Sequence, residues 1–194
     1  TIRQSIIEML FEAKSGHTAG PLGMADIFTL LYFEVLQHDP KNPTWADRDR
    51  LILSNGHICP VLYATLAHAG YFPVEELMTL RKFGSRLQGH PHRESLPGVE
   101  TSSGPLGSGL SQAVGMALAE RIDNPYSSKY FYCLTGDGEL DEGQIWEALM
   151  FAAAKKVDNL IVTVDWNDAQ IDGSTQQVCD LGDLKAKFKA FGFE

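Results

Sequence analysis

Residues 130–167, YFYCLTGDGELDEGQIWEALMFAAAKKVDNLIVTVDWN, contain the pattern that decides the fold. Two short runs of apolar or β-branched residues, at 130–134 and 160–164, predict strands, and the apolar spacing of residues 142–156 predicts a helix between them. Apolar strands joined by a helix are typical of a parallel sheet that is covered on both faces. The stretch therefore predicts an α/β fold with three α/β/α layers and a mostly parallel sheet.

Further elements are predicted on either side of this stretch. A strand is expected at residues 50–53, and helices are expected at 2–14, 24–36, 60–68, 73–83, 111–121 and 180–191. The helix at 24–36 is strongly apolar and is expected to be buried. We interpret six apolar or aromatic residues as core: Met24, Tyr32, Phe33, Trp146, Met150 and Phe151. Residues 84–109 have six glycines and no periodicity, and a loop of this length inside a domain is usually functional.

The charge balance narrows the class of ligand. The formal net charge of −9 argues against a nucleic-acid partner. An acidic protein can still hold a phosphate ligand when a cation and backbone N–H groups supply the positive potential. Cys59, Cys133 and Cys179 form no CxxC pair and are interpreted as reduced thiols of a cytoplasmic protein. No apolar run approaches the roughly 20 residues of a membrane span, so no membrane partner is expected.

Two glycines and an aspartate follow the first predicted strand, and an asparagine follows the second. The first strand leads into Gly136, Asp137 and Gly138, and the second leads into Asn167. Ligands of open α/β sheets bind beyond the carboxyl ends of the strands, where Asp137 and Asn167 are expected to lie side by side. Carboxylate and amide oxygens suit Mg²⁺ or Ca²⁺, and the two glycines would let the backbone approach a diphosphate.

Each half of this pattern has a simpler explanation when taken alone. A lone Gly-Asp-Gly is usually a plain turn, and a lone asparagine after a strand is usually a turn residue or a helix cap. The conjunction is more specific, because the 28 residues between Gly138 and Asn167 fit one strand–helix–strand crossover. We therefore interpret the two segments as a diphosphate site bridged by a metal ion.

Three of the six histidines, His17, His57 and His90, directly follow a glycine in predicted loops. A single histidine in a loop is by default a surface residue. Three Gly-His pairs indicate a shared role, because imidazole gives and takes protons near neutral pH. His38 and His68 lie in or beside predicted helices and are interpreted as structural or solvated.

Longer strings narrow the kind of enzyme. They are Ser15-Gly16-His17, Leu53-Ser54-Asn55-Gly56-His57, Gly89-His90-Pro91, Ser103-Gly104-Pro105-Leu106-Gly107 and residues 136–143. In order and content they resemble transketolase, a thiamine-diphosphate enzyme, and particularly the split type that is encoded as two polypeptides. The resemblance runs over nearly the whole chain and implies that residues 1–194 are the diphosphate-binding domain, without a pyrimidine-binding domain.

The resemblance also implies roles for individual residues. Asp137, Asn167 and the backbone carbonyl of Ala169 match the ligands of Mg²⁺ or Ca²⁺. The residues expected at thiamine diphosphate are His57, Gly104, Leu106, Gly136, Gly138, Asn167 and Ile171. The residues expected in catalysis are His17, His57, His90 and Glu142. In the family, the counterparts of His17 and His90 reach the hydroxyls of the substrate, and that of Glu142 lies in a proton-sharing network at the subunit interface.

By the same resemblance, the chain is the N-terminal subunit of a transferase of the pentose phosphate pathway. It would transfer a two-carbon ketol unit from a ketose phosphate to an aldose phosphate. The expected partner is a second polypeptide with the pyrimidine-binding and C-terminal domains, in an α₂β₂ heterotetramer or a dimer. The sequence stops at Glu194, before a strand and a histidine loop of the family, so the chain alone is expected to bind cofactor poorly and to catalyse nothing.

Two positions depart from the family pattern. Asp168 stands where a small or uncharged residue is frequent, and it would weaken diphosphate binding unless its side chain points to solvent. Ala169 replaces a larger aliphatic residue. Three alternatives stay open: a deoxyxylulose-phosphate synthase-like subunit, a decarboxylase-like subunit of a 2-oxo acid dehydrogenase, and a cofactor-free scaffold homologue. The Gly-His-Pro string and the acidic run at 138–143 favour transketolase.

Overall fold

The predicted strand–helix–strand unit is present in the computed structural model, which describes residues 1–193. Strand β2 (Phe131–Gly136) is followed by helix α6 (Gly143–Lys155) and strand β3 (Leu160–Asp165). The two strands pair in parallel, in a register that ends with Gly136 opposite Asp165. The predicted parallel crossover is therefore confirmed, and both strands run past their predicted ends.

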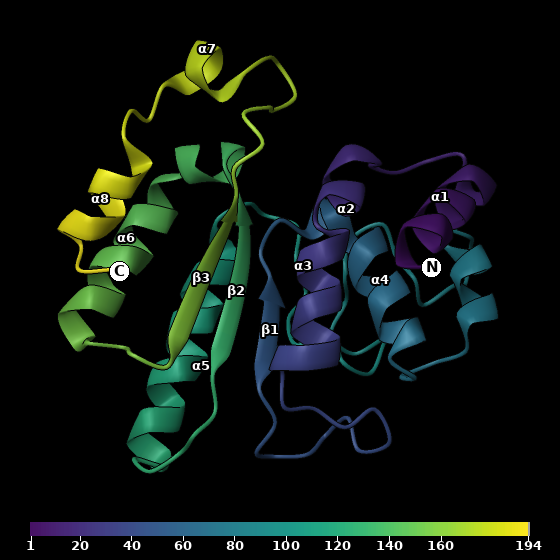
Figure 1. Cartoon of the computed structure of the whole chain (residues 1–194), viewed down its shortest axis with the longest axis horizontal. Helices are drawn as coiled ribbons and strands as arrows, with labels where there is room; N and C mark the ends of the chain where they lie inside the picture. The colour runs from purple at the N-terminus through teal and green to yellow at the C-terminus, as the bar shows by residue number, and fades with distance from the viewer. Residues whose placement is uncertain (194) are drawn as a thin grey trace. The chain divides into compact units, whose positions relative to one another are not determined.

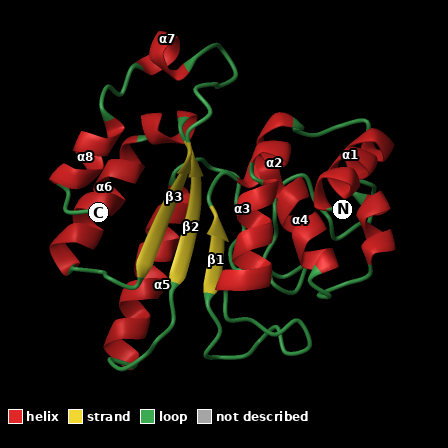
Figure 2. Cartoon of the chain, viewed as in Figure 1, coloured by secondary structure: helices red, strands yellow, loops and turns green. Residues whose placement is uncertain are grey.

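Strand β1 (Arg50–Leu53) completes a three-stranded sheet of order β1-β2-β3. Directly after β1, the N–H of Ser54 donates to the carbonyl of Leu134 at 2.9 Å. Figure 2 shows the three strand arrows pointing in the same direction. The carboxyl ends of the strands consequently lie at one edge of the sheet, and the α/β fold class with a parallel sheet is confirmed.

The described chain divides into two compact units. The first consists of residues 1–50 and 56–104, and the second consists of residues 51–55 and those from 105 onward. Except for Arg50 at the start of β1, the sheet belongs to the second unit. Each unit is described below by itself.

The core of the second unit lies between the sheet and its helices. Helix α5 (Ser108–Asp123) contributes Leu110 and Ala113, and these side chains are fully buried together with Cys133 of β2 and Leu149 of α6. Helix α5 packs against both β2 and α6, and Figure 1 shows the two helices beside the strands. Burying a leucine or phenylalanine side chain contributes about 1.5–3 kcal/mol, so this cluster stabilises the packing of the helices on the strands.

The first unit is mainly helical. Its elements are α1 (Ile2–Ala13), α2 (Ala19–Gly23), α3 (Ala25–Leu30), the π-helical turn η1 (Leu31–Val35), the 3₁₀ turn η2 (Gly56–Ile58), α4 (Cys59–His68) and the 3₁₀ helix η3 (Val74–Thr79). Helix α4 is buried from Cys59 to Ala67, and it packs against α1, α2 and α3. It is therefore the central helix of this unit.

Two of the predicted helices are wrong in part. The segment 24–36 forms α3 and then the π-helical turn, and it buries only one side, since Phe28 is fully buried whereas Leu30 and Phe33 are 51% and 47% exposed. The segment 73–83 forms only the six residues of η3, because Leu80 adopts an extended ψ of 126° and ends the helical path. The interpretation of Phe33 as a core residue is therefore wrong.

Met150 and Phe151 of α6 were also expected in the core, and they are 58% and 46% exposed. The reason is helical geometry, because α6 buries Ile145, Ala148, Leu149 and Ala152 on one side and turns the two larger residues outward. Apolarity alone does not say which side of a helix is covered.

The chain after β3 is less regular. The predicted helix at 180–191 is present in a shorter form as α8 (Leu184–Ala190), and the unpredicted short helix α7 (Thr175–Cys179) precedes it. The side chain of Asp183 caps α8 by accepting from the N–H of Ala186 at 2.8 Å. Among the three cysteines, Cys59 and Cys133 are buried and Cys179 is exposed. Within residues 1–193, each helix is too short or too polar to span a bilayer.

Candidate diphosphate and metal site

Asp137 lies at the carboxyl end of β2, in the second unit. It is 3% exposed, and it has two backbone donors: its Oδ1 accepts from the N–H of Gly138 at 2.9 Å and its Oδ2 accepts from the N–H of Asp168 at 2.6 Å. The second bond joins the turn after β2 to the turn after β3. The structure therefore brings the segments of Asp137 and Asn167 together at one edge, as their spacing predicts.

Asn167 is exposed and is oriented by its neighbours. Its Nδ2 donates to Oδ2 of Asp165 at 3.1 Å, and its Oδ1 accepts from the N–H of Ala169 at 3.0 Å. The pKa of Asp165 is raised overall. Burial is the largest cause, the hydrogen bond from Asn167 opposes it, and the charge of Asp137 adds to it. Because the amide nitrogen donates to Asp165, the amide oxygen is the atom of Asn167 that a cation would use, beside the hydrogen bond that it already accepts from Ala169.

The oxygen atoms at this edge suit a divalent cation as ligands. A carboxylate, an amide oxygen and a backbone carbonyl form the hard oxygen set that Mg²⁺ and Ca²⁺ prefer. Among the described residues, no group of three or more His, Cys, Asp or Glu side chains gathers as a metal site. A cation at this edge would therefore depend on amide, backbone and ligand oxygens beside the single carboxylate of Asp137.

The turn after β2 is built tightly. Gly138 opens the 3₁₀ turn η4 (Gly138–Asp141), and a Cβ added to it would lie 3.0 Å from Cβ of Gln170. A side chain at this position would press on the loop after β3, so glycine permits the close approach of the two segments. Glu142 is exposed and precedes the first residue of α6. The N-terminus of α6 favours an anion.

The loop before α5 is held to the same edge. Gly107 adopts the left-handed region with φ 85°, and its N–H donates to Oε1 of Glu139 at 2.5 Å. The carbonyl of Leu106 accepts from Nε2 of Gln144 at 2.5 Å, and Gly104 has no atom within 4 Å of an added Cβ. The sequence did not single out Glu139 or Gln144, and no local pattern marks them, because their partners are distant in sequence.

The side chains of Ile171 and Asp168 are exposed to solvent. Ile171 is 97% exposed, so on this chain it packs on nothing substantial. Asp168 is exposed in the left-handed region with φ 55°, and its Oδ1 accepts from the hydroxyl of Thr175 at 2.6 Å. Its carboxylate thus contacts Thr175 and is exposed to solvent.

The three Gly-His histidines form one cluster in the first unit. The ring centroids of His17 and His57 are 4.9 Å apart, with a tilt of 58°. Burial lowers the pKa of His57 to about 4, and positive charge on His17 or His90 lowers it further in the same direction. Burial also lowers the pKa of His90, followed by the charges of Arg81 and His17. His57 is therefore neutral at pH 7, and its ring can donate one hydrogen bond and accept another.

Arg81 links the loops that carry two of these histidines. Its Nη1 donates to Oγ of Ser15 at 2.9 Å, and its Nη2 lies 3.5 Å from the carbonyl of Gly89. Ser15 and Gly89 are close in sequence to His17 and His90. Arg81 itself adopts φ 59°, a conformation that is uncommon for a residue with a side chain.

His38 and His68, two of the three other histidines, have structural contacts. Nε2 of His38 lies 2.7 Å from the carbonyl of Tyr32, and Nδ1 lies 3.0 Å from the hydroxyl of Tyr71. Nε2 of His68 lies 2.9 Å from the hydroxyl of Ser5. Both rings join segments of the first unit.

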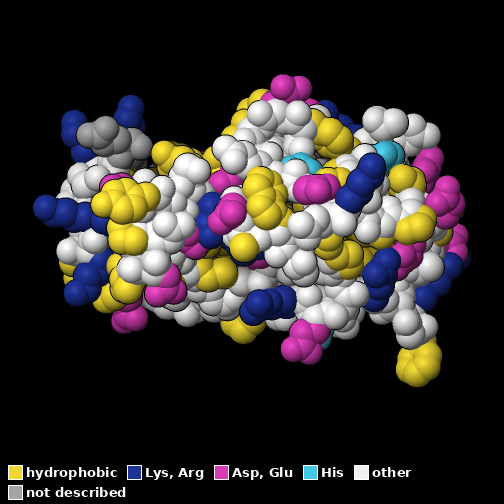
Figure 3. Space-filling view, turned by 90° about the horizontal axis from the view of Figure 1, so that it is seen from below, with side chains coloured by type: hydrophobic (Ala, Val, Ile, Leu, Met, Phe, Trp, Pro, Cys, Tyr) yellow, Lys and Arg dark blue, Asp and Glu magenta, His cyan; other side chains and the backbone are white. Residues whose placement is uncertain are grey.

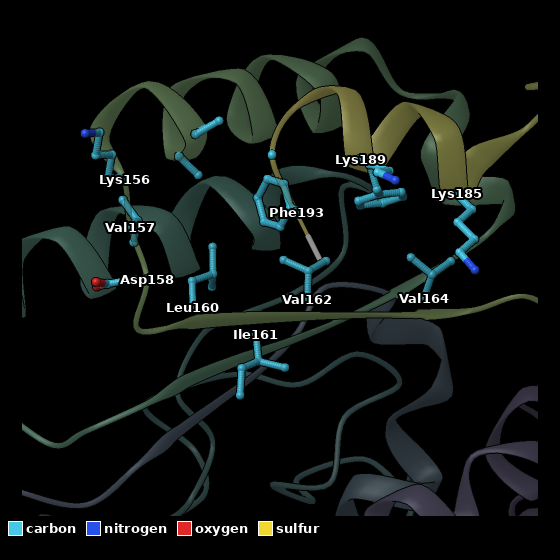
Figure 4. Close-up of a pocket in the computed structure, with 14 residues that line it drawn as sticks. Lys156, Val157, Asp158, Leu160, Ile161, Val162, Val164, Lys185, Lys189 and Phe193 are labelled. Atoms are coloured by element: carbon cyan, nitrogen blue, oxygen red, sulfur yellow. The ribbon is translucent and has the colours of Figure 1, made fainter.

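One hollow of the second unit lies along β3 and the helices beside it. Its volume is about 1090 Å³, and it lies between β3 and the helices α6 and α8. Figure 4 shows Val162 and Val164 pointing into it and Ile161 pointing to the opposite face of the sheet. Its walls are mainly apolar, and neither Asp137 nor Asn167 lines it.

A smaller hollow of about 450 Å³ adjoins the strand ends and is lined in part by Asp137, Trp166 and Asp168. On the face drawn in Figure 3, Lys and Arg side chains are interspersed with Asp and Glu side chains and form no continuous basic field.

An α/β sheet with a glycine-rich turn, a carboxylate and an amide at its strand ends defines a class of proteins that bind phosphate-bearing cofactors. Comparison with known proteins narrows this class. The family described as transketolase, thiamine diphosphate binding domain, matches residues 1–194. The chain belongs to this family.

Two relatives are themselves named as subunits. The 6-deoxy-6-sulfo-D-fructose transketolase subunit SqwG of Clostridium sp. (strain MSTE9) is 45% identical, covering 99% of this chain and 69% of that protein. A subunit of the apulose-4-phosphate transketolase of Phocaeicola vulgatus is 41% identical, covering 99% of this chain and 67% of that protein. Among solved structures, the transketolase from Leishmania mexicana is 40% identical with a TM-score of 0.93, covering 100% of this chain and 30% of that chain.

Proposed function

We propose that this chain is the N-terminal subunit of a two-polypeptide transketolase that moves a two-carbon ketol unit from a ketose phosphate to an aldose phosphate. The observation that carries the proposal is the match, over 99% of the chain, to two relatives named as transketolase subunits. The same names favour transketolase over the synthase-like, decarboxylase-like and scaffold alternatives. The proposed place of action is sugar phosphate metabolism in the cytoplasm.

The proposed metal is Mg²⁺ or Ca²⁺, held by Asp137, Asn167 and the backbone carbonyl of Ala169. Support comes from the bond between Asp137 and the N–H of Asp168, which holds the two ligand-bearing turns together. The net charge of −9 also favours a cation as the partner of a diphosphate. Gly136 and Gly138 would bring backbone close to the diphosphate, and the N-terminus of α6 would favour its charge.

The proposed catalytic histidines are His17, His57 and His90. Thiamine diphosphate, when bound, acts as the electron sink that allows a carbon–carbon bond beside a carbonyl to break. A neutral His57 can donate a hydrogen bond to one oxygen and accept one from another, because its pKa lies near 4. His17 and His90 are the proposed contacts of the substrate hydroxyls.

The proposed partner is a polypeptide with the pyrimidine-binding domain, in an α₂β₂ assembly. The exposure of Glu142 and Ile171 supports this, since both are expected to contact groups that this chain does not supply. Leu106 and Gly104 would lie beside the aminopyrimidine ring. Sugar phosphates are the proposed substrates.

The test is reconstitution with the pyrimidine-binding polypeptide of the same organism. The mixture is assayed for ketol transfer from a ketopentose phosphate to an aldopentose phosphate, with pyruvate as the competing donor, and titrated calorimetrically with thiamine diphosphate in Mg²⁺. We expect heat of binding and transfer from the pentose phosphate. Consumption of pyruvate alone would support the alternatives, and no heat with the partner present would support the scaffold.

A further inference from the structure

Glu139 is a buried acidic residue without a role in the proposed function. It is 2% exposed and lies in η4. Its Oε1 accepts from the hydroxyl of Ser54 at 2.5 Å and from the N–H of Gly107 at 2.5 Å. Its Oε2 accepts from the N–H of Gly136 at 3.1 Å. One carboxylate therefore has three donors.

The three donors come from three separate segments of the second unit. Ser54 follows β1, Gly136 ends β2, and Gly107 immediately precedes α5. A carboxylate this deeply buried is tolerated only when donors replace the water that it has lost. Glu139 and its donors are thus mutually dependent, and they fix the ends of two strands and the loop before α5 in one arrangement.

The Leu106–Gly107 peptide is held at both of its polar ends. Glu139 accepts from the N–H of Gly107, and Gln144 donates to the carbonyl of Leu106 at 2.5 Å. The N–H and the C=O of one peptide lie in a single rigid plane, so fixing both fixes the orientation of that plane. A side chain on Gly107 would also strike Gln144, since its Cβ would lie 2.7 Å from Cγ of Gln144.

We propose that Glu139 is a positioning residue that, together with Gln144, sets the orientation of the 105–107 loop and joins it to the strand ends that receive the cofactor. The inference rests on the proposed function, which assigns Leu106 to the aminopyrimidine ring and Gly136 to the diphosphate. Glu139 does not touch the cofactor. It holds the segment of Leu106 and the segment of Gly136 together as one rigid piece.

The informative variant is Glu139→Gln, which keeps shape and volume. If its oxygen accepts from Ser54 and Gly107, its NH₂ group faces the N–H of Gly136, and two donors oppose each other. Ser54→Ala is a milder variant that removes one donor with little change in volume. Glu147→Gln, at an exposed position of α6, is the matched control for the exchange of a carboxylate for an amide.

Two readouts are taken. Calorimetry with thiamine diphosphate and Mg²⁺, on the chain reconstituted with its partner, gives the affinity. Because hydrogen bonds to charged groups are among the stronger ones, we expect roughly ten- to thirtyfold weaker binding for Glu139→Gln, about threefold for Ser54→Ala and none for the control. Amide hydrogen exchange, measured by NMR on the chain alone, is expected to accelerate at Gly107 and Gly136 and not at Val162 in β3.

The outcomes separate the two proposals. Failure of the unsubstituted chain to bind thiamine diphosphate with its partner would overturn the proposed function, and the exchange experiment would still report on Glu139. Affinity within threefold of normal in Glu139→Gln, or exchange that accelerates equally at Val162, would overturn the positioning role. If Glu139→Gln does not fold, Ser54→Ala decides. About threefold weaker binding together with faster exchange at Gly107 would support the positioning role, whereas unchanged affinity and unchanged exchange at Gly107 would overturn it.

Discussion

Two glycines of helix α5 give opposite predictions for the same substitution. At Gly109, an added Cβ would lie 2.6 Å from Cα, Cβ and Oγ of Ser54, so the obstacle includes backbone. At Gly115, nothing lies within 4 Å of an added Cβ, and the residue is exposed. Gly109→Ala tests whether α5 lies against the end of β1 as closely as the structure shows, and Gly115→Ala is its internal control.

The magnitudes follow from two opposing effects. Replacing glycine by alanine within a helix stabilises by roughly 0.5–1 kcal/mol, and this is the whole effect expected at Gly115. Overpacking of a filled site costs about 1–3 kcal/mol, and a contact with backbone belongs in the upper part of that range. We therefore expect Gly109→Ala to lower the free energy of unfolding by about 1–2 kcal/mol, which separates the two variants by about 2–3 kcal/mol.

Urea denaturation followed by circular dichroism measures both variants, and thermal melts should separate them by roughly 4–12 °C. Because Ser54 donates to Glu139, Gly109→Ala should also weaken binding of thiamine diphosphate by the reconstituted enzyme, whereas Gly115→Ala should not. Equal stabilisation by both substitutions would refute the close packing of α5 on Ser54.

Three further predictions concern charge. Replacing Arg81 with methionine should raise the titration midpoint of His90 in NMR spectra, because a nearby positive charge is lost. Lys82→Met is the control and should leave the midpoint of His90 unchanged. Equal midpoints in the two variants would show that the charge of Arg81 does not act on His90. The ring of His57 should titrate near pH 4. Its contribution to the free energy of unfolding is therefore fully present above pH 6.5 and is lost as the pH falls toward 4. A titration midpoint at 6.5 would show that the ring is not desolvated. Asp168→Asn should tighten thiamine diphosphate binding, measured by calorimetry, by no more than roughly threefold, because solvent screens an exposed carboxylate. A larger gain in affinity would mean that Asp168 faces the phosphates.

The strand ends could be predicted from the sequence because every signal there is local. The apolar strands around α6 and the 28-residue interval between Gly138 and Asn167 fix a crossover without knowledge of any distant residue. The register that places Gly136 opposite Asp165 then follows from the parallel pairing. Whether Asp137 and Asn167 bind a metal stays a prediction.

Other features depend on contacts between distant segments. Glu139 finds its partners 85 and 32 residues away, and nothing in the sequence around it indicates that it points inward. Residues 51–55 join the second unit although residues on both sides of them belong to the first, and no change of composition marks this exchange. Phe33 is outward because only one side of its helix is covered, and apolarity alone cannot identify that side.

The three thiols differ in a way that is useful for labelling. Burial raises the pKa of Cys59 to about 12 and also raises that of Cys133, so at pH 8 roughly one Cys59 in ten thousand is a thiolate. Cys179 is exposed, 12 residues beyond Asn167 along the chain. A maleimide fluorophore should therefore modify the native chain at this one sulfur, and it would report on the segment after β3 without any engineered cysteine.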